Sequence, residues 1–429
     1  MNDLDATAEQ GPSLWTCPFC PLLCDTFSVG AESAGLRLVG SDCPRARAGL
    51  AQFNPAAAPA LPELNGQSCA LDEAIASAAQ WLAASRQPLI SGLGTDVAGA
   101  RALYPLACAI GAICDPTGGE ALMHGLRALQ DRGQFSTTLA EVRTRADLIV
   151  FLGGLPTDLA PLLAQRCGIS DPQVAQRHVV VVGASPADNA LLADWTGPGV
   201  STETVPLHGD LFTTVALLSA LVAQQPLPSV PEDLAALALR LRAARYAVIV
   251  GAPARLPTQG ALIVEAVNQV VGTLNRTTRA ASLWVGGGDG AATVNQTFAW
   301  LSGLPLRSRA GPRGLEHEPL AFDTTRLLAA GAVDLLLWVA SFDAEDVPPL
   351  NNLPMVVLGP PAMAAACRRP GLQTVFIPVA TPGIGADGHL FRTDGTVLMP
   401  LKAVYRSPLP GVAGVIGHLT QALRQGAVA

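Results

Sequence analysis

Short apolar runs, most of which end in glycine or alanine, recur along the chain with helical stretches between them. Uninterrupted apolar runs of this length are typical of strands that are buried on both faces of a parallel sheet. Their alternation with amphipathic segments predicts an α/β protein with mostly parallel sheets. The predicted strands are 88–94, 147–154, 178–183, 247–252, 333–340, 354–359 and 374–380, and the clearest predicted helices are 70–85, 209–223 and 232–244.

The first 55 or so residues follow a different pattern. Two short segments, 27–29 and 36–39, alternate in polarity around a turn region at 30–35 that begins and ends with glycine. This arrangement predicts a small β-hairpin. Segment 54–64 holds three prolines and a run of alanines, which predicts a linker to the α/β body.

Four cysteines flank the predicted hairpin. Cys17, Cys20 and Cys24 precede it within eight residues, and Cys43 follows it. Three thiolates at this spacing and a distant fourth can converge on one tetrahedral metal centre. The remaining five cysteines are scattered and the total of nine is odd, so a disulfide framework fits poorly. We therefore predict one metal centre on these four residues, either a [4Fe–4S] cluster or zinc, the alternative being reduced thiols in a packed lobe.

Composition narrows the possible environments and partners. The net charge is −7 and no stripe of lysine or arginine is present, which argues against nucleic-acid binding. No uncharged apolar stretch has the length and flanks of a membrane span, and the acidic, polar first ten residues argue against an export signal and for a cytoplasmic protein. Hydrophobic residues make up 49% and charged residues only 14%, so we expect much of the surface to be buried against partner proteins.

Two glycine-rich turns invite a nucleotide-binding interpretation. Segment 91–99 follows a predicted strand, but its third glycine lies two places too far along for the dinucleotide fingerprint. Segment 286–290 could let backbone amides approach a phosphate or a pterin. Tight strand-to-helix turns need glycine for steric reasons alone, and we favour that explanation for both segments.

Several motifs together carry a family resemblance. The run Trp-Thr-Cys-Pro-Phe-Cys-Pro-Leu-Leu-Cys-Asp at 15–25 resembles the iron–sulfur start of molybdenum and tungsten bis-pterin oxidoreductases, and specifically the B-type subunit of formylmethanofuran dehydrogenase. Asp115, the Met123-His124-Gly125 segment and the Thr-Leu-Ala-Glu-Val-Arg-Thr-Arg-Ala-Asp run at 138–147 are similar to the same protein, as are 311–313 and 378–395. The resemblance covers residues of roughly 15 to 405. Because it spans nearly the whole chain, it supports an inference about the fold more strongly than one about the function.

The resemblance implies a multi-domain α/β fold like that of formate dehydrogenase and other molybdopterin oxidoreductases, with a small N-terminal cysteine-rich β lobe. The β-barrel that closes the pterin site in longer family members is expected to be missing. The implied domains are a four-cysteine lobe at 12–56, an α/β domain in two segments at 57–145 and 311–405, an inserted Rossmann-like α/β domain at 146–310, and a C-terminal tail at 406–429.

The departures from the family pattern bear on activity. Met123 stands where the dehydrogenase presents a cysteine or selenocysteine to the metal, and a thioether cannot deprotonate and is a much weaker ligand. His124 is retained, either as a titrating group or, as we favour, as a packing residue. Apolar residues replace polar and cationic ones further on, and only one arginine of that stretch is kept. We therefore expect a vestigial active site with no catalytic residue and no molybdopterin or tungstopterin, formed by Met123, His124, Leu155, Ala160, Leu162, Leu163 and Arg166.

The family includes a variant that fits these losses. In methylotrophic bacteria, a protein that resembles this chain belongs to a formyltransferase/hydrolase complex, in which formyl groups pass from formyl-tetrahydromethanopterin to a methanofuran-type carrier and are released as formate. By that resemblance, the chain is a noncatalytic, structural B-type subunit, with hydrolase, formyltransferase and C-type subunits as partners. The alternative is a redox-active B-type subunit of a molybdenum or tungsten formylmethanofuran dehydrogenase. A stand-alone iron–sulfur carrier would not need so long an α/β scaffold.

Overall fold

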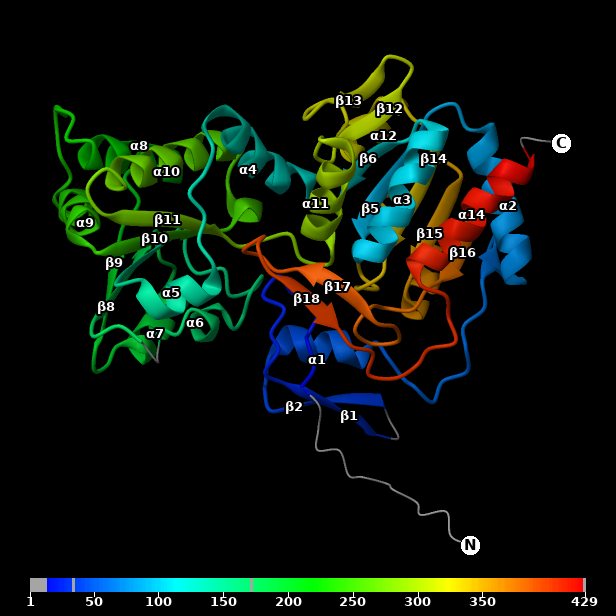
Figure 1. The fold of residues 1–429 in the computed structure, drawn as a ribbon, viewed down its shortest axis with the longest axis horizontal. Helices are drawn as coiled ribbons and strands as arrows, with labels where there is room; N and C mark the ends of the chain where they lie inside the picture. Colours follow the sequence, from blue (N-terminus) through cyan, green and yellow to red (C-terminus); the bar gives the residue numbers. More distant parts are fainter. Residues whose placement is uncertain (1–13, 33–34, 170–172, 427–429) are drawn as a thin grey trace, which may run out of the picture.

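The computed structural model describes residues 14–32, 35–169 and 173–426 of the 429-residue chain. Two sheets, one of five strands and one of nine, stand side by side with helices packed on the faces of both (Figure 1). Every strand of the smaller sheet comes from residues between 148 and 284, whereas the larger sheet is built from strands that precede and follow this stretch. The α/β class with mostly parallel strands is therefore confirmed, and the domain bounds given above stay predictions.

The five-stranded sheet is parallel throughout, with the strand order β11-β10-β7-β8-β9. Alternate residues of its strands face two separate apolar cores, because successive side chains of a strand point to opposite faces. One face packs against α8, α9 and α10, and the other packs against α5, α6 and α7. The elements are α5 (Leu139–Arg145), β7 (Leu148–Leu152), α6 (Leu163–Arg166), β8 (Arg177–Val182), α7 (Pro186–Trp195), β9 (Val200–Val205), α8 (Leu211–Val222), α9 (Glu232–Ala243), β10 (Tyr246–Gly251), α10 (Gly260–Leu274) and β11 (Arg279–Trp284).

The nine-stranded sheet has five parallel central strands, in the order β6-β5-β14-β15-β16. Two antiparallel strands extend it at each edge, β12 and β13 beside β6, and β3 and β4 beside β16. One face is covered by α2, α3, α11 and α14, and the other by shorter elements. The strands are β3 (Glu63–Leu64), β4 (Gln67–Ser68), β5 (Pro88–Gly94), β6 (Ile113–Pro116), β12 (Ser308–Gly311), β13 (Gly314–His317), β14 (Leu335–Ala340), β15 (Met355–Gly359) and β16 (Thr374–Pro378).

The helices around this sheet begin and end at the expected signals. The Asp96 side chain caps the start of α3 by accepting a hydrogen bond from the backbone N–H of Gly99 at 2.9 Å. Gly111, with a φ of 64°, ends the same helix in the left-handed conformation that glycine tolerates. The helices are α2 (Leu71–Ala84), α3 (Val97–Ile110), α11 (Ala291–Ser302), α12 (Thr324–Ala329), α13 (Ala364–Cys367) and α14 (Val412–Gly426), with short 3-10 turns at Pro253–Arg255 (η1) and Pro361–Met363 (η2).

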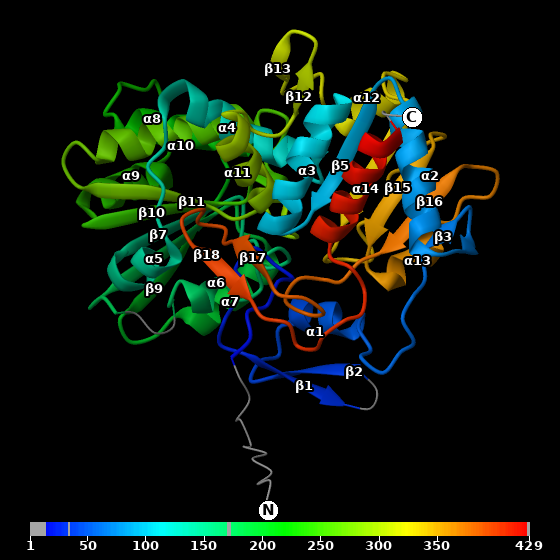
Figure 2. The ribbon, with the colours of Figure 1, turned by 45° about the vertical axis from the view of Figure 1, so that its right-hand side comes forward.

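The N-terminal segment lies below the junction of the two sheets (Figure 2). It contains the predicted hairpin, in which β1 (Ser28–Glu32) pairs with β2 (Gly35–Val39), followed by α1 (Pro44–Ala51). A second hairpin, β17 (Gly388–Phe391) with β18 (Leu398–Leu401), lies between this segment and the sheets. The Trp15 indole N–H donates to the carbonyl of Gly383 at 2.7 Å and so fixes Trp15 to the segment before β17.

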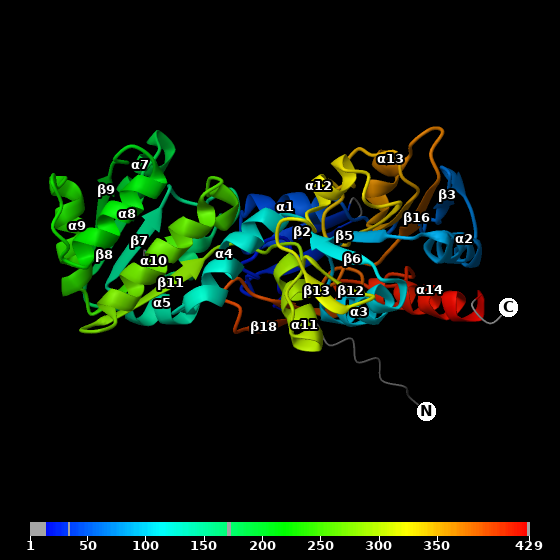
Figure 3. The same ribbon diagram turned by 90° about the horizontal axis from the view of Figure 1, so that it is seen from above.

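Two further helices, α14 at the end of the described chain and α4 between the sheets, complete the fold. The predicted C-terminal tail at 406–429 contains α14, which packs on α2 and α3 through Val415, Ile416 and Leu419. Helix α4 (Gly119–Arg132) lies between the two sheets when the molecule is seen from above (Figure 3), and it packs on α10. Throughout the described part of the chain, no helix is both long enough and apolar enough to span a bilayer.

Candidate functional site

The four cysteines of the predicted metal centre are all buried and belong to one apolar cluster beneath the five-stranded sheet. The loop that carries three of them is closed by a hydrogen bond from the backbone N–H of Cys17 to the carbonyl of Cys24 at 2.8 Å. Leu23, with a φ of 44°, allows this tight turn. Cys43 stands at the start of α1. The fold thus brings the four cysteines into one region.

Burial disfavours the thiolate form of the three cysteines in this loop. It raises the pKa of Cys17 well above its ordinary value, that of Cys20 to about 11 and that of Cys24 to about 12. Neighbouring thiols add to the increase, and Arg45 and Arg166 oppose it only in part.

The fit to a metal is incomplete. The donor chemistry suits a thiophilic ion, because a bound metal would stabilise the thiolates that burial disfavours. In the part of the chain that the structure describes, however, no three His, Cys, Asp or Glu side chains are arranged so that they could hold a metal ion. The four thiols are thus gathered in one region without forming a ligand set, and the centre stays a prediction.

Met123 and His124 lie on α4 and outside the cysteine cluster. Both are buried, and the His124 ring lies against Gly260 of α10, where an added Cβ would come within 2.5 Å of the ring carbon Cδ2. Burial is the main reason that the pKa of His124 is lowered. A neutral ring that fills the space over a glycine supports the packing role for this residue.

The other predicted site residues lie beside the cysteines. Leu155, Ala160 and Leu163 are 2%, 0% and 4% exposed and share the apolar cluster of the four cysteines, and Leu162 packs against it. Arg166 is directed to Asp25, and its Nη1 lies 2.8 Å from Oδ1 of that residue. The structure therefore gathers Leu155, Ala160, Leu162 and Leu163 into a packed apolar core.

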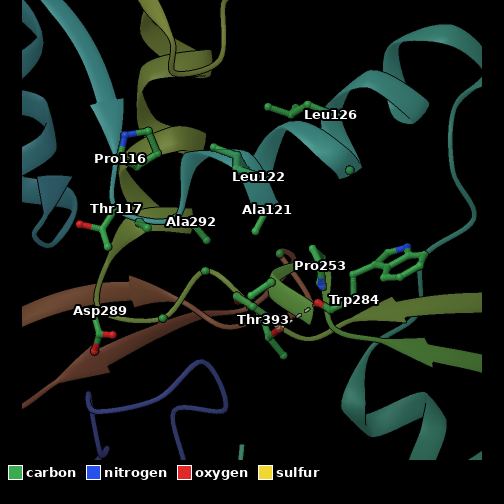
Figure 4. Close-up of a pocket in the computed structure, with 18 of the residues that line it drawn as sticks. Pro116, Thr117, Ala121, Leu122, Leu126, Pro253, Trp284, Asp289, Ala292 and Thr393 are labelled. Atoms are coloured by element: carbon green, nitrogen blue, oxygen red, sulfur yellow. Dashed lines mark hydrogen bonds between the residues drawn. The ribbon is translucent and has the colours of Figure 1, made fainter. Parts of the chain in front are cut away.

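An open cavity of about 660 Å³ lies instead on another face of α4 (Figure 4). It is formed where the carboxyl ends of β5 and β6 meet the ends of β10 and β11, and in α/β proteins ligands bind at such strand ends. Helix α4 supplies one wall, which is apolar and consists of Ala121, Leu122, Gly125, Leu126 and Leu129.

Acidic side chains gather at the other end of the cavity. Asp343, Glu345 and Asp346 follow β14, and Asp289 lies in the glycine-rich turn after β11. Thr117 donates its hydroxyl to the carboxylate of Asp346 at 3.2 Å. Burial, followed by the charge of Asp289, raises the pKa of Asp346 to about 7. Burial also raises the pKa of Asp289 to about 6, although Arg45, whose Nη2 is 3.8 Å from Oδ2 of Asp289, opposes the increase.

This lining does not fit a phosphate-bearing bis-pterin cofactor of the kind implied by the resemblance. Proteins neutralise phosphates with arginine and lysine, and the described residues that line the cavity include no arginine, lysine or histidine. The first turns of α4 and α11 line it too and favour negative charge there. That preference is already met by Asp289, which directly precedes α11, and by Asp346, which is bonded to Thr117 beside α4.

The acidic end of the cavity was not found from the sequence. Asp343, Glu345 and Asp346 come directly after a predicted strand, and Asp289 stands in the glycine-rich turn at 286–290. Polar residues that follow parallel strands are the usual signal for a site at the edge of a sheet. That signal was present in both segments, but their proximity depends on the packing of one sheet beside the other.

Known proteins similar to this chain fall into one group. The chain is 30% identical over 369 residues to the Fhc B-type subunit of the formyltransferase/hydrolase complex of Methylorubrum extorquens, an alignment that spans 84% of this chain and 97% of the relative. It is 27% identical over 418 residues to the B-type subunit of tungsten-containing formylmethanofuran dehydrogenase 2 of Methanocaldococcus jannaschii, spanning 90% of this chain and 92% of the relative. A scan against protein-family models found no match.

Solved structures give the same result for the fold. A chain in the crystal structure of the formyltransferase/hydrolase complex FhcABCD from Methylorubrum extorquens, determined with methylofuran, matches with a TM-score of 0.74 and 28% identity, over 86% of this chain and all of that one. Acetylene hydratase from Pelobacter acetylenicus matches with a TM-score of 0.60 over 96% of this chain and 69% of that one, and at 11% identity this likeness concerns the fold alone. The chain belongs to the family of B-type subunits that comprises those of the formyltransferase/hydrolase complex and of formylmethanofuran dehydrogenase.

Proposed function

We propose that this chain is the noncatalytic, structural B-type subunit of a cytoplasmic formyltransferase/hydrolase complex. Its partners are hydrolase, formyltransferase and C-type subunits, which move formyl from formyl-tetrahydromethanopterin to a methanofuran-type carrier and release formate. Acyl transfer and metal-assisted hydrolysis on other subunits need no pterin centre and no electron path in this one. The relationship to the Fhc B-type subunit, which spans nearly the whole of that relative, supports the role.

One observation carries the noncatalytic part of the proposal. Met123, which stands where the dehydrogenases present a cysteine or selenocysteine, is 3% exposed on α4. The neighbouring His124 packs on Gly260, and the segment around Leu155 and Ala160 is filled with apolar side chains. A reaction that moves protons and electrons needs polar groups directed at its centre, whereas the side chains of Leu155, Ala160 and Leu163 are apolar and packed together.

The alternative is a redox-active B-type subunit of a tungsten or molybdenum formylmethanofuran dehydrogenase. The two tungsten-enzyme relatives, at 27% and 25% identity, favour it. The acidic lining of the cavity weighs against it, because a phosphate-bearing cofactor would meet carboxylates there.

An exposed apolar surface supports a role in assembly. Trp300 of α11 is 64% exposed, and its ring meets Phe391 of β17 edge-on with the ring centres 5.1 Å apart. Leu398 of β18 is paired directly with Phe391 across the hairpin and is also exposed. Clustered apolar side chains of this kind mark surfaces that other subunits cover.

The proposal is tested by co-expressing the chain with its partner subunits. Met123→Cys should leave formyl transfer and hydrolysis by the assembled complex unchanged, whereas omission of the chain should abolish assembly. Trp300→Glu should weaken assembly, and Leu239→Glu, a matched change at an exposed site on α9, should not. A large loss of turnover in the Met123→Cys complex, with assembly intact, would show that the old site still has a chemical role.

A further inference from the structure

The cavity on α4 has two ends of opposite character. Figure 4 shows Asp289 and Thr117 toward one end and Leu126 and Trp284 toward the other. A volume of about 660 Å³ is in the range that takes a small organic ligand. The cavity therefore offers an apolar body a wall to lie against and a polar head group an acidic surface.

Three of the four carboxylates at the acidic end have no positive partner among the described residues. Asp289 has an ion pair with Arg45 at 3.8 Å, but Asp343, Glu345 and Asp346 form no ion pair with any residue in the described ranges. Carboxylates that share a partly enclosed space repel one another, and a cation placed among them removes that repulsion.

The charge at this end is spread over several separate side chains. A bound metal ion needs several oxygen ligands at about 2.0 to 2.6 Å from one point. Among the residues that the structure describes, no group of carboxylates converges in that way. An ammonium group is satisfied differently, because it is a donor of up to three hydrogen bonds that can be directed to separate acceptors.

Two residues that line the cavity each have a buried polar atom without a partner. Asp394 is 7% exposed, and its Oδ2 accepts from Arg392 at 2.6 Å, but its Oδ1 has no hydrogen-bond partner. The indole N–H of Trp284 is also buried and unpaired. Buried polar atoms are nearly always hydrogen-bonded, so a small movement of either side chain toward the cavity would give its unpaired atom a ligand or a water molecule as partner.

The Trp284 indole also gives the apolar end a flat surface. It lies against Gly251 at the end of β10, where an added Cβ would come within 2.4 Å of the indole carbon Cζ3. Only glycine at this position leaves room for the ring beside the strand. An indole in such a place can pack against a flat ligand or support a nearby cation.

We propose that this cavity binds an organic cation, an ammonium group carried on a flat apolar body, with the ammonium facing Asp289 and Asp346 and the body lying between α4 and Trp284. The same lining rejects small anions such as formate and phosphate. This site is independent of the structural role proposed above, since it rests on the lining of the cavity and needs no partner protein.

The test compares three probes of similar shape and different charge. Binding of 2-phenylethylammonium, 2-phenylethanol and 3-phenylpropanoate to the full chain is measured by ligand-observed NMR and calorimetry at pH 8. The ammonium probe should bind roughly tenfold more tightly than the alcohol, since one charge-assisted hydrogen bond is worth that much, and the carboxylate should bind least. Tighter binding of the carboxylate, equal binding of all three, or no binding of the ammonium probe would overturn the proposal.

Substitutions in the lining of the cavity test where the ammonium probe binds. Asp346→Asn should remove most of the preference for the ammonium probe, and Asp72→Asn, a matched change at an exposed site on α2, should leave it unchanged. Leu126→Trp narrows the apolar end without altering its charge, so it should weaken the binding of the ammonium and alcohol probes alike. If Asp346→Asn does not fold, the Leu126→Trp variant still tests the proposal. Unaltered binding in that variant would show that the probe binds outside the cavity.

Discussion

The core around the four cysteines and the cavity beside α4 are regions of opposite character. In the core, Leu155, Ala160 and Leu163 are almost fully buried among apolar side chains. The cavity at the strand ends is open and has an acidic lining. The difference shows that apolar side chains can fill one region of this fold completely while the ends of parallel strands in another region leave space for a ligand.

The largest expected effect concerns the cysteine side. Cys20→Ser should reduce the content of iron or zinc and lower the melting temperature sharply, because small segments that bind a structural metal depend on it to fold. Cys167→Ser, at a buried cysteine outside the predicted centre, should keep the metal. Elemental analysis and thermal unfolding measure both. A brown protein with broad visible absorption indicates iron–sulfur and a colourless one zinc; full metal content in Cys20→Ser would remove the predicted centre.

Truncation of a leucine should lower stability more in the apolar core around the cysteines than on the wall of the cavity. Leu163→Ala should destabilise the chain by about 2–5 kcal/mol, because a fully packed leucine leaves a cavity. Leu126→Ala on the cavity wall should have a much smaller effect, since its side chain already faces open space. Chemical denaturation of the two variants, followed by circular dichroism, gives the comparison, and equal losses would mean that the two sides are packed alike.

Replacement of an alanine by the larger phenylalanine should also lower stability in the apolar core and not on the cavity wall. Ala160→Phe should cost about 1–3 kcal/mol of stability, because a fully buried alanine in a tight core has no room for a ring. Ala121→Phe on the cavity wall should be tolerated. If both variants melt at the wild-type temperature, the region around Ala160 contains space that the structure does not show.

A pH experiment gives the smallest effect. Because burial raises the pKa of Asp346 to about 7 from an ordinary value of 3.8, the folded state favours the protonated carboxyl. The stability of the wild type should therefore fall as the pH rises from about 4 to 7, and Asp346→Asn should escape part of this loss. We expect the variant to be on the order of 1–2 kcal/mol more stable than the wild type at pH 8 and equal to it near pH 3. A constant difference across this range would show that Asp346 ionises freely.

Most of the fold could be predicted because its central strands are buried on both faces. The runs that became β5, β8, β10 and β15 are mostly apolar without a helical period, which distinguishes them from the helices around them. Strand β9 was missed because its sequence Val-Ser-Thr-Glu-Thr-Val has polar residues at an exposed sheet edge. Strand β6 was missed because it has only four residues, Ile113–Pro116, and lies between two helices.

The site was predictable only in part. Spacing alone marked Cys17, Cys20 and Cys24, since their closeness along the chain implies closeness in space. The positions of Met123 and Leu155 were marked by comparison with a family pattern. The acidic end of the cavity joins Asp289 to Asp346 across 57 positions of the chain, and only the packing of the two sheets brings them together.

Metal and pterin analysis of the purified complex is the most direct test of the noncatalytic role, because this role requires that the chain hold no pterin-bound metal. Tungsten and molybdenum are quantified per chain by mass spectrometry, pterin is quantified by its fluorescence after oxidation, and formate-linked reduction of viologen dyes is measured on the same sample. We expect neither metal, no pterin and no dye reduction, while formyl transfer and hydrolysis by the complex proceed. One equivalent of tungsten or molybdenum with pterin, together with dye reduction, would contradict it and would make this chain a working part of a dehydrogenase.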